Sequence, residues 1–148
     1  MKPFWKVNHQ GADPVVGVTP TDDEMNEAIS SARASLDQFF ENFNDPKASQ
    51  ESFLLKIRFE INGKVEHIWL ADLNVSALQM SGTVANEPRM RELKFMQEIN
   101  FTPVQITDWM YLEDGFLVGG FTTKAIRSKL RANERAEFDA GTPYKFSS

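Results

Sequence analysis

Cysteine is absent from this 148-residue sequence, histidine occurs only twice, and there is no long apolar run. Without cysteine the chain cannot form disulfides, thiolate zinc sites, iron–sulfur clusters or a cysteine nucleophile. A membrane-spanning helix needs about 18 consecutive apolar residues, and polar residues from Asn8 to Asp13 interrupt the stretch where a signal peptide would lie. These absences predict a cytoplasmic protein with no membrane partner.

Positive charge is also scarce, because 16 Lys and Arg residues stand against 21 Asp and Glu residues and leave a net charge of −5. An acidic chain repels the phosphate backbone of nucleic acids. The basic cluster between Lys124 and Arg131 has no interleaved aromatic residues and is typical of a solvated helix face. We therefore expect no nucleic-acid partner, and binding through this cluster is only a third hypothesis.

The remaining composition is that of a folded protein. Hydrophobic residues make up 41% of the chain and charged residues 25%, which excludes a disordered or fibrous chain. A chain of this length fits one domain. Glycine and proline recur within residues 1–20 and predict an extended N-terminal arm, so residues 21–148 are expected to form the single domain.

A capping box marks the start of the first helix. Thr21 and Glu24 have the spacing at which a threonine oxygen and a glutamate carboxylate bind unpaired backbone N–H groups. Apolar residues then recur every three or four positions from Met25 to Phe43, and Asn44–Pro46 ends the pattern. This predicts one amphipathic helix of about six turns with a buried apolar face.

A hairpin follows the helix. Apolar and polar residues alternate over Phe53–Ile61 and predict a strand, Asn62–Gly63 suits a type I′ turn, and Val65–Leu73 is expected to return as the second strand. The register stays open at this point. A two-residue loop places His67 beside Arg58, whereas a three-residue loop places it on the phenylalanine-rich face.

Four further strands and two C-terminal helices are expected beyond this hairpin, with a charged helical or turn-like segment at Arg89–Met96. The strands are Leu78–Ala85, an edge strand at Phe101–Ile106 interrupted by Pro103, and a hairpin of Trp109–Leu112 and Phe116–Val118. Thr122 or Thr123 is expected to cap a helix that runs through Leu130, and another short turn of helix is expected at Glu134–Asp139. This order predicts an α+β fold, in which the N-terminal amphipathic helix and the C-terminal helices pack on a curved, mainly antiparallel sheet.

His67 is the first candidate for chemistry because an imidazole titrates near neutral pH. As a general base it would need an orienting carboxylate. Candidates for that group are Asp72, Glu87, Asp108 and Asp114. A packed, hydrogen-bonded strand histidine is the alternative. Metal-ligand spacings and phosphate-binding glycine loops are missing, so we expect no metal ion and no cofactor.

A second dense patch consists of Asp108, Trp109, Met110 and Tyr111. Trp and Tyr combine a large apolar area with one hydrogen-bonding group, so such a set can line a ligand pocket or anchor an interface. The alternative is that Asp108 caps a turn and the aromatic side chains lie in the core.

Five short motifs stand in order along the chain. They are Glu66-His67-Ile68-Trp69-Leu70, Asn86-Glu87-Pro88, Asp108-Trp109-Met110-Tyr111, Asp114-Gly115-x-Leu117-Val118-Gly119-Gly120-Phe121-Thr122 and Glu134-Arg135-Ala136-x-Phe138-Asp139. Over Phe53–Asp139 the chain resembles the bacterial YegJ-like family of unknown function. The resemblance implies an α+β domain and brings no established activity. It also implies that seven side chains face a common site or lock a common core: His67, Trp69, Asn86, Glu87, Asp108, Trp109 and Tyr111.

The leading hypothesis is a non-enzymatic protein-interaction protein. Its first helix begins with a group of acidic residues, namely Asp22, Asp23, Glu24 and Glu27. These would complement a basic partner, because complementary charge speeds and orients encounter without catalytic residues. By analogy with other small acidic bacterial proteins, the partner would be a toxin domain and the chain an immunity protein. The alternative is a small-molecule binding domain or hydrolase that uses His67 with Glu87 or Asp108.

Overall fold

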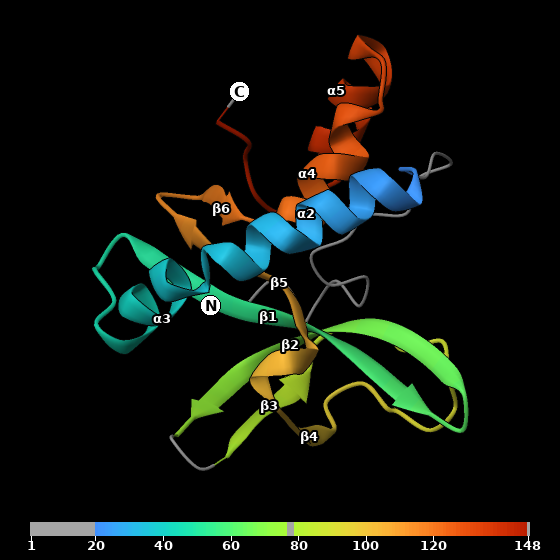
Figure 1. The fold of residues 1–148 in the computed structure, drawn as a ribbon. Coiled ribbons are helices and arrows are strands. Elements are labelled where there is room, and N and C mark those ends of the chain that lie inside the picture. Colours follow the sequence, from blue (N-terminus) through green and yellow to red (C-terminus); the bar gives the residue numbers. More distant parts are fainter. Residues whose placement is uncertain (1–19, 77–78, 148) are drawn as a thin grey trace.

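Six antiparallel strands form one sheet in the computed structural model of the chain, which describes residues 20–76 and 79–147 (Figure 1). Their order across the sheet is β4-β3-β2-β1-β5-β6. The strands are β1 (Gln50–Ile61), β2 (Lys64–Val75), β3 (Met80–Val84), β4 (Glu98–Phe101), β5 (Ile106–Glu113) and β6 (Phe116–Gly119). The helices are α2 (Asp22–Ala34), α3 (Leu36–Asn44), the short 3-10 helix η1 (Pro103–Gln105), α4 (Phe121–Ser128) and α5 (Ala132–Ala140). The predicted α+β single domain is confirmed, and the predicted arm, apart from Pro20, lies outside the described residues.

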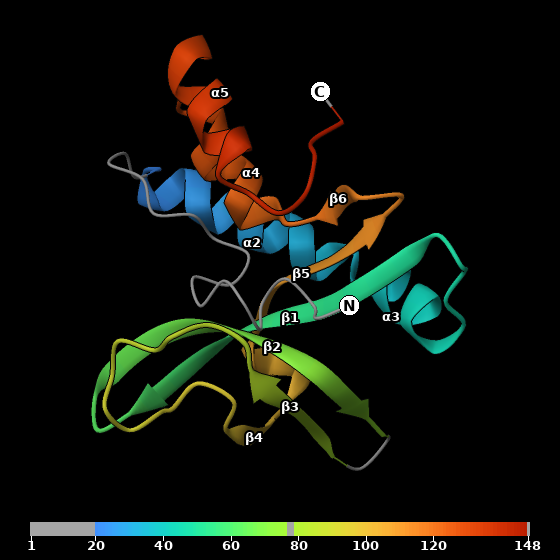
Figure 2. The same ribbon diagram turned by 180° about the vertical axis from the view of Figure 1, so that it is seen from behind.

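Apolar side chains pack on both faces of the sheet. Leu55 of β1 belongs to a core that includes Phe39 of α3, whereas its neighbour Leu54 belongs to a second core with Tyr144 near the C-terminus. Successive strand residues point to opposite faces, so both faces of β1 are buried at this point. Figures 1 and 2 show α2, α4 and α5 at one end of the molecule and strands β2, β3 and β4 at the other.

The N-terminal helix begins as predicted but is not continuous. The capping box is confirmed, because the backbone N–H of Thr21 donates to the Glu24 carboxylate at 2.8 Å and the N–H of Glu24 donates to the Thr21 hydroxyl at 3.2 Å. The prediction of one continuous helix is wrong, because the backbone leaves helical geometry at Ser35 (φ −109°, ψ 12°). The segment therefore forms two helices, α2 and α3. There the indole N–H of Trp109 donates to the carbonyl of Ala32 and to the hydroxyl of Ser35, both at 3.1 Å. The side chain of a distant strand thus binds a carbonyl that a continuous helix would use for its own ladder.

The first hairpin has the two-residue loop. Ile57 pairs with Ile68 and Arg58 pairs with His67, while Asn62 (φ 52°) and Gly63 (φ 77°) both have the positive φ of a type I′ turn. This register places His67 on the face of Arg58, away from the phenylalanine-rich core, and its side chain is exposed.

The predicted edge strand at Phe101–Ile106 is wrong in its position. The edge strand β4 ends at Phe101, and Pro103 begins η1 instead. Proline has no N–H to donate to a strand ladder, and Thr102 and Gln105 form a capping box that closes the turn. The strand predicted at Leu78–Ala85 is present as β3, although Leu78 itself lies outside the described residues.

The turn from β6 into α4 depends on Gly119. Its φ is +77°, and a Cβ at this position would collide with the backbone carbonyl and the indole ring of Trp109. Gly115 in the preceding β5–β6 turn has a similar φ of +82°, but a Cβ there would meet nothing within 4 Å. Alanine substitutions at these two positions therefore distinguish the cost of backbone strain, which both share, from the cost of a steric clash, which only Gly119 has.

We expect Gly119→Ala to lower the free energy of unfolding by at least about 3 kcal/mol, because steric displacement adds to the roughly 1–2 kcal/mol of left-handed backbone strain. Gly115→Ala is the matched control and should lose only about 1 kcal/mol from that strain. Urea unfolding of both variants measures the difference. Equal losses would contradict the close approach of Gly119 to Trp109.

Candidate functional site

The residues of the motifs separate onto the two faces of the sheet. Trp109 and Tyr111 point toward α2 and α3, where Trp109 binds the helix break and the Tyr111 hydroxyl accepts a hydrogen bond from Gln38 at 3.3 Å. Both aromatic side chains are buried, with 1% and 3% exposed. Asp108 lies on the opposite face, in register with Lys56. The motifs therefore contribute to both cores, and Trp109 and Tyr111 do not lie on the same side of the sheet as Asp108.

Asp108 is the centre of the most polar part of the buried interior. It is fully buried, and its carboxylate accepts hydrogen bonds from the backbone N–H groups of Trp109 (2.8 Å), Phe121 (3.1 Å) and Thr122 (2.9 Å). The Thr122 hydroxyl donates a further bond at 2.6 Å. Three of these four donors belong to the first turn of α4, whose N-cap Gly120 has no side chain to offer. The predicted capping of this helix by Thr122 or Thr123 is wrong, because an aspartate from β5 performs it.

Lys56 lies beside this carboxylate and is 9% exposed. Its ammonium group is 3.2 Å from the Thr122 hydroxyl and 5.3 Å from the centre of the Trp69 ring. Burial raises the pKa of Asp108, while the positive charge of Lys56 and the bonds from Thr122 act in the opposite direction. Thr122 thus links a buried cation to a buried anion. The geometry suits a structural connection between β1, β5 and α4.

His67 does not form the predicted dyad with Asp108. Its exposed ring places Nδ1 3.2 Å from the Thr107 hydroxyl, and Asp108 receives its bonds from the start of α4 and from Trp109. The pairing of His67 with Glu87, whose side chain is exposed, stays a prediction. Asn86 has a structural contact, since its side-chain oxygen accepts the backbone N–H of Trp69 at 2.8 Å.

The predicted acidic residues lie on the outside of α2. Asp22, Asp23 and Glu27 are exposed, whereas Glu24 is engaged within the chain by the capping box and by Lys129, whose ammonium lies 3.1 Å from its carboxylate. The bonds from Thr21 and the charge of Lys129 lower the pKa of Glu24 from 4.5 to about 2. Three of the four acidic candidates are thus available to a partner.

Sequence reasoning missed three further exposed acidic residues on and after α3. Asp37 and Glu41 of α3 and the C-cap residue Asp45 are also exposed. Asp37 and Glu41 are four residues apart and so share one face of α3, and this spacing was the signal that could have found them. We use the name acidic face for these three residues together with Asp22, Asp23 and Glu27.

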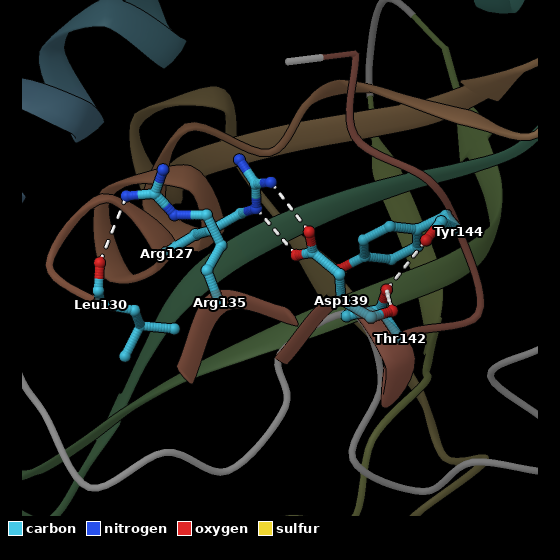
Figure 3. A network of polar contacts seen from close by, with 6 residues as sticks. All are labelled: Arg127, Leu130, Arg135, Asp139, Thr142 and Tyr144. Carbon is cyan, nitrogen blue, oxygen red and sulfur yellow. Dashed lines mark hydrogen bonds and ion pairs between the residues drawn. The ribbon is translucent and has the colours of Figure 1, made fainter. Parts of the chain in front are cut away.

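Two of the four cations of the basic cluster, Arg127 and Lys129, form ion pairs within the chain. Arg127 makes two bonds of 2.8 Å with the carboxylate of Asp139, and its guanidinium lies 4.3 Å from the centre of the Phe146 ring. Figure 3 shows this pair between α4 and α5, near Thr142 and Tyr144. With Lys129 bound to Glu24, two of the four charges are used structurally. This arrangement favours the interpretation of a helix face over that of a nucleic-acid site.

No group of three or more His, Asp or Glu side chains within residues 20–76 and 79–147 could hold a metal ion. Among the helices of that same part of the chain, none is long and apolar enough to cross a membrane.

The interaction of Lys56 with Asp108 can be measured by a double-mutant cycle. We expect Asp108→Asn and Lys56→Met each to lower the free energy of unfolding by about 2–3 kcal/mol, because each leaves a buried charge or donor without its counterpart. The double variant should lose about 1 kcal/mol less than the sum. Arg58→Met, an exposed cation on the same strand, is the control and should change stability by at most about 0.5 kcal/mol. Strict additivity would show that the two groups are independent.

The bonds of Glu24 predict a pH dependence. Because folding lowers the pKa of this carboxylate to about 2, its contribution is present above pH 4.5 and is lost as the pH falls from 4.5 toward 2. Glu24→Gln keeps the capping-box geometry but has no charge to lose. Urea unfolding at several pH values should therefore show the stability difference between wild type and variant narrowing over this window. A difference that stays constant from pH 7 to pH 2.5 would refute the ionic contribution.

Comparisons with known proteins place the chain among uncharacterized bacterial proteins. A family model described as "Uncharacterized protein conserved in bacteria (DUF2314)" matches residues 22–146. "Uncharacterized protein YegJ" of Escherichia coli (strain K12) is 32% identical over 99 residues, which cover 66% of this chain and 63% of that protein. A protein of Neisseria meningitidis serogroup B (strain ATCC BAA-335 / MC58) named "Putative ankyrin repeat protein" is 30% identical over 139 residues, which cover 88% of this chain and 55% of that protein.

The chain therefore spans less than two thirds of the length of these two curated relatives. No solved structure matches it. The resemblance predicted from the five motifs is confirmed, since all of them lie within the matched residues.

Proposed function

The chain belongs to the DUF2314 family of uncharacterized bacterial proteins, and we propose that it is a non-enzymatic protein-interaction protein of the cytoplasm whose partner is basic. The acidic face carries this proposal. Its six carboxylates are exposed, and none of them forms an ion pair with another described residue. Unpaired charge of one sign on a rigid surface attracts an oppositely charged protein and orients it during encounter.

Two cations near the acidic face have other hydrogen-bond or ion-pair partners. Arg33, the only cation of α2 and α3, directs its guanidinium to backbone carbonyls near η1. Lys129, the C-cap residue of α4, is paired with Glu24. The six carboxylates of the acidic face outnumber these two cations, and this excess of negative charge is the property that a basic partner would recognise.

A toxin domain is the partner that we propose for this surface, with the chain as its immunity protein. Capping a basic toxin needs a stable acidic surface and no catalytic group. The Neisseria relative carries "ankyrin repeat" in its name, and ankyrin repeats form extended binding surfaces in proteins. A domain of this family joined to such repeats is consistent with a role in protein interaction.

The alternative function, a small-molecule binding domain or hydrolase at His67, has less support. Asp108 already accepts four hydrogen bonds and cannot also orient His67 without giving up the cap of α4. Within this alternative, the pairing of His67 with Glu87 stays a prediction.

Neutralisation of the acidic face tests the proposal. The variant combines Asp37→Asn, Glu27→Gln and Glu41→Gln, and the control makes the same change of charge elsewhere with Glu51→Gln, Glu98→Gln and Glu137→Gln. All six side chains are exposed. At low salt we expect the first variant to capture its partner from native-host lysate about tenfold less well than wild type, with the control unchanged.

Mass spectrometry of the captured protein and a salt titration complete this experiment. A basic toxin-like protein whose capture weakens with salt is the expected result. Equal capture by both variants would refute the acidic face as the binding surface. A purified monomer that carries a small molecule and no protein would favour the site at His67.

A further inference from the structure

The C-terminal segment, residues 142–147, follows α5 and lies along the outer edge of β6 (Figures 1 and 2). The backbone N–H of Lys145 donates to the carbonyl of Gly115 at 2.9 Å, and its carbonyl accepts the N–H of Leu117 at 2.8 Å. These two bonds form a parallel bridge between Lys145 and Phe116, whereas the strands of the sheet are antiparallel to one another. The segment therefore adds to the sheet edge as a short extra strand.

The side chains of this segment alternate in direction, as those of a strand do. Tyr144 is 5% exposed and belongs to the same buried core as Leu54. Phe146 packs against that core too, with its ring 5.6 Å from the ring of Tyr144. Lys145 between them is exposed, and its ammonium lies 5.7 Å from the centre of the Phe116 ring. The edge of β6 thus accommodates two aromatic side chains with a cation between them.

Strand addition of this kind is a general mode of peptide recognition. Main-chain bonds at a sheet edge provide affinity, and pockets for alternate side chains provide specificity. The edge of β6 offers both, and the chain's own C-terminal segment shows which sequence pattern fits. The occupant expected at this edge is therefore an extended segment with the pattern aromatic, basic, aromatic.

The cation that contacts Phe146 is held in place without the segment. The Arg127 guanidinium lies 4.3 Å from the centre of the Phe146 ring, and two bonds of 2.8 Å to the carboxylate of Asp139 fix its position (Figure 3). Arg127 belongs to α4 and Asp139 to α5, so this ion pair stays when Phe146 leaves. Another aromatic ring can then make the same cation–π contact.

The segment has few attachments to the sheet edge, and a chain terminus opens at a lower free-energy cost than the rest of a fold. Among the described residues, its backbone bonds to residues 115–119 are the two of Lys145. The hydroxyl of Thr142 donates to the carbonyl of Asp139 at 2.9 Å and keeps the end of α5 closed when the residues after it are released. Release of residues 144–147 therefore leaves α5 and β6 in place.

We propose that the edge of β6 binds an extended segment of a partner protein, which displaces the C-terminal segment and pairs parallel to β6 in its place. The partner's aromatic side chains take the positions of Tyr144 and Phe146, and its Lys or Arg lies over the ring of Phe116. This proposal is independent of the acidic face, whose residues belong neither to β6 nor to the C-terminal segment.

Hydrogen exchange of the wild-type chain tests whether the segment opens without the rest of the fold. The N–H of Leu117 is protected by the segment, whereas the N–H of Gly120 donates to the carbonyl of Trp109 at 2.7 Å. We expect Leu117 to exchange at least about tenfold faster than Gly120, because it needs only local opening. Equal exchange of both amides at the rate of global unfolding would overturn the proposal.

Peptide binding tests the site itself, and the probe is a fluorescent peptide with the sequence of residues 141–147. Tyr144→Ser combined with Phe146→Ser in the full chain releases the segment. We expect this serine variant to bind the peptide at least about tenfold more tightly than wild type, in which the tethered segment competes at high effective concentration. A peptide with serine at both aromatic positions should bind neither protein.

A disulfide that locks the segment is the matched control. The chain has no cysteine, and Phe116 and Lys145 are bridge partners at an exposed edge, so Phe116→Cys with Lys145→Cys can form a single disulfide. We expect the reduced protein to bind the peptide and the oxidised protein not to bind it, because only the reduced protein can release the segment. If the serine variant does not fold, this comparison decides the question, and binding by neither form overturns the proposal.

The position of binding is tested by a second disulfide. A peptide with cysteine in place of its lysine should join Phe116→Cys in the serine variant and should not join Val65→Cys, an exposed position on β2. Equal joining at both positions, equal affinity of the serine variant and wild type, or peptide binding by the oxidised protein overturns the proposal. A wild-type dimer in ultracentrifugation that the oxidised protein does not form would identify a second copy as the occupant and would overturn the partner protein.

Discussion

The rest of the structure depends on the burial of one carboxylate at the middle of the sheet. Asp108 cannot remain charged away from water unless donors surround it, and the chain supplies three from the first turn of α4 and one from Trp109. A helix N-terminus has unpaired N–H groups that need acceptors, so the two requirements satisfy each other. The same contact fixes where α4 leaves the sheet, and through the bond of Lys129 to Glu24 it also influences where α2 lies. Gly119 permits this arrangement because any side chain there would meet Trp109.

Two consecutive residues of β5 each attach a helical element, although α4 also packs beside α2 and its Phe121 contacts the ring of Trp109. The carboxylate of Asp108 binds α4 and the indole of Trp109 binds the break between α2 and α3, since neighbouring strand residues point in opposite directions. The motif Asp108-Trp109-Met110-Tyr111 is therefore an attachment point for α4 and for the break between α2 and α3. The carboxylate of Asp108 and the indole N–H of Trp109 hold these helices in place.

Local patterns predicted most of the elements, and long-range contacts account for the rest. The capping box of Thr21, the type I′ turn of Asn62 and Gly63 and the alternation of β1 depend on residues close in sequence, so they could be predicted. The break at Ser35 and the cap of α4 by Asp108 could not, because each depends on a side chain more than ten residues away. Of the candidate site, the sequence predicted the acidic start of α2 but not the exposed acidic residues Asp37 and Glu41 of α3. It predicted His67 as a possible base, and only the register of the hairpin shows that its ring is exposed beside Arg58.

The charged residues fall into two groups, namely those that form contacts within the domain and those that are exposed on the acidic face. Lys56, Asp108, Arg127, Asp139 and Glu24 are engaged inside the domain, where loss of a partner would cost stability. The carboxylates of the acidic face have no such role, and removing them should leave the fold unchanged. Surface charge without a structural task can be selected for recognition alone, and it can vary to match a partner while the framework stays the same. The motifs therefore explain how the outer surface of α2 and α3, to which we assign the proposed interaction, is held in place.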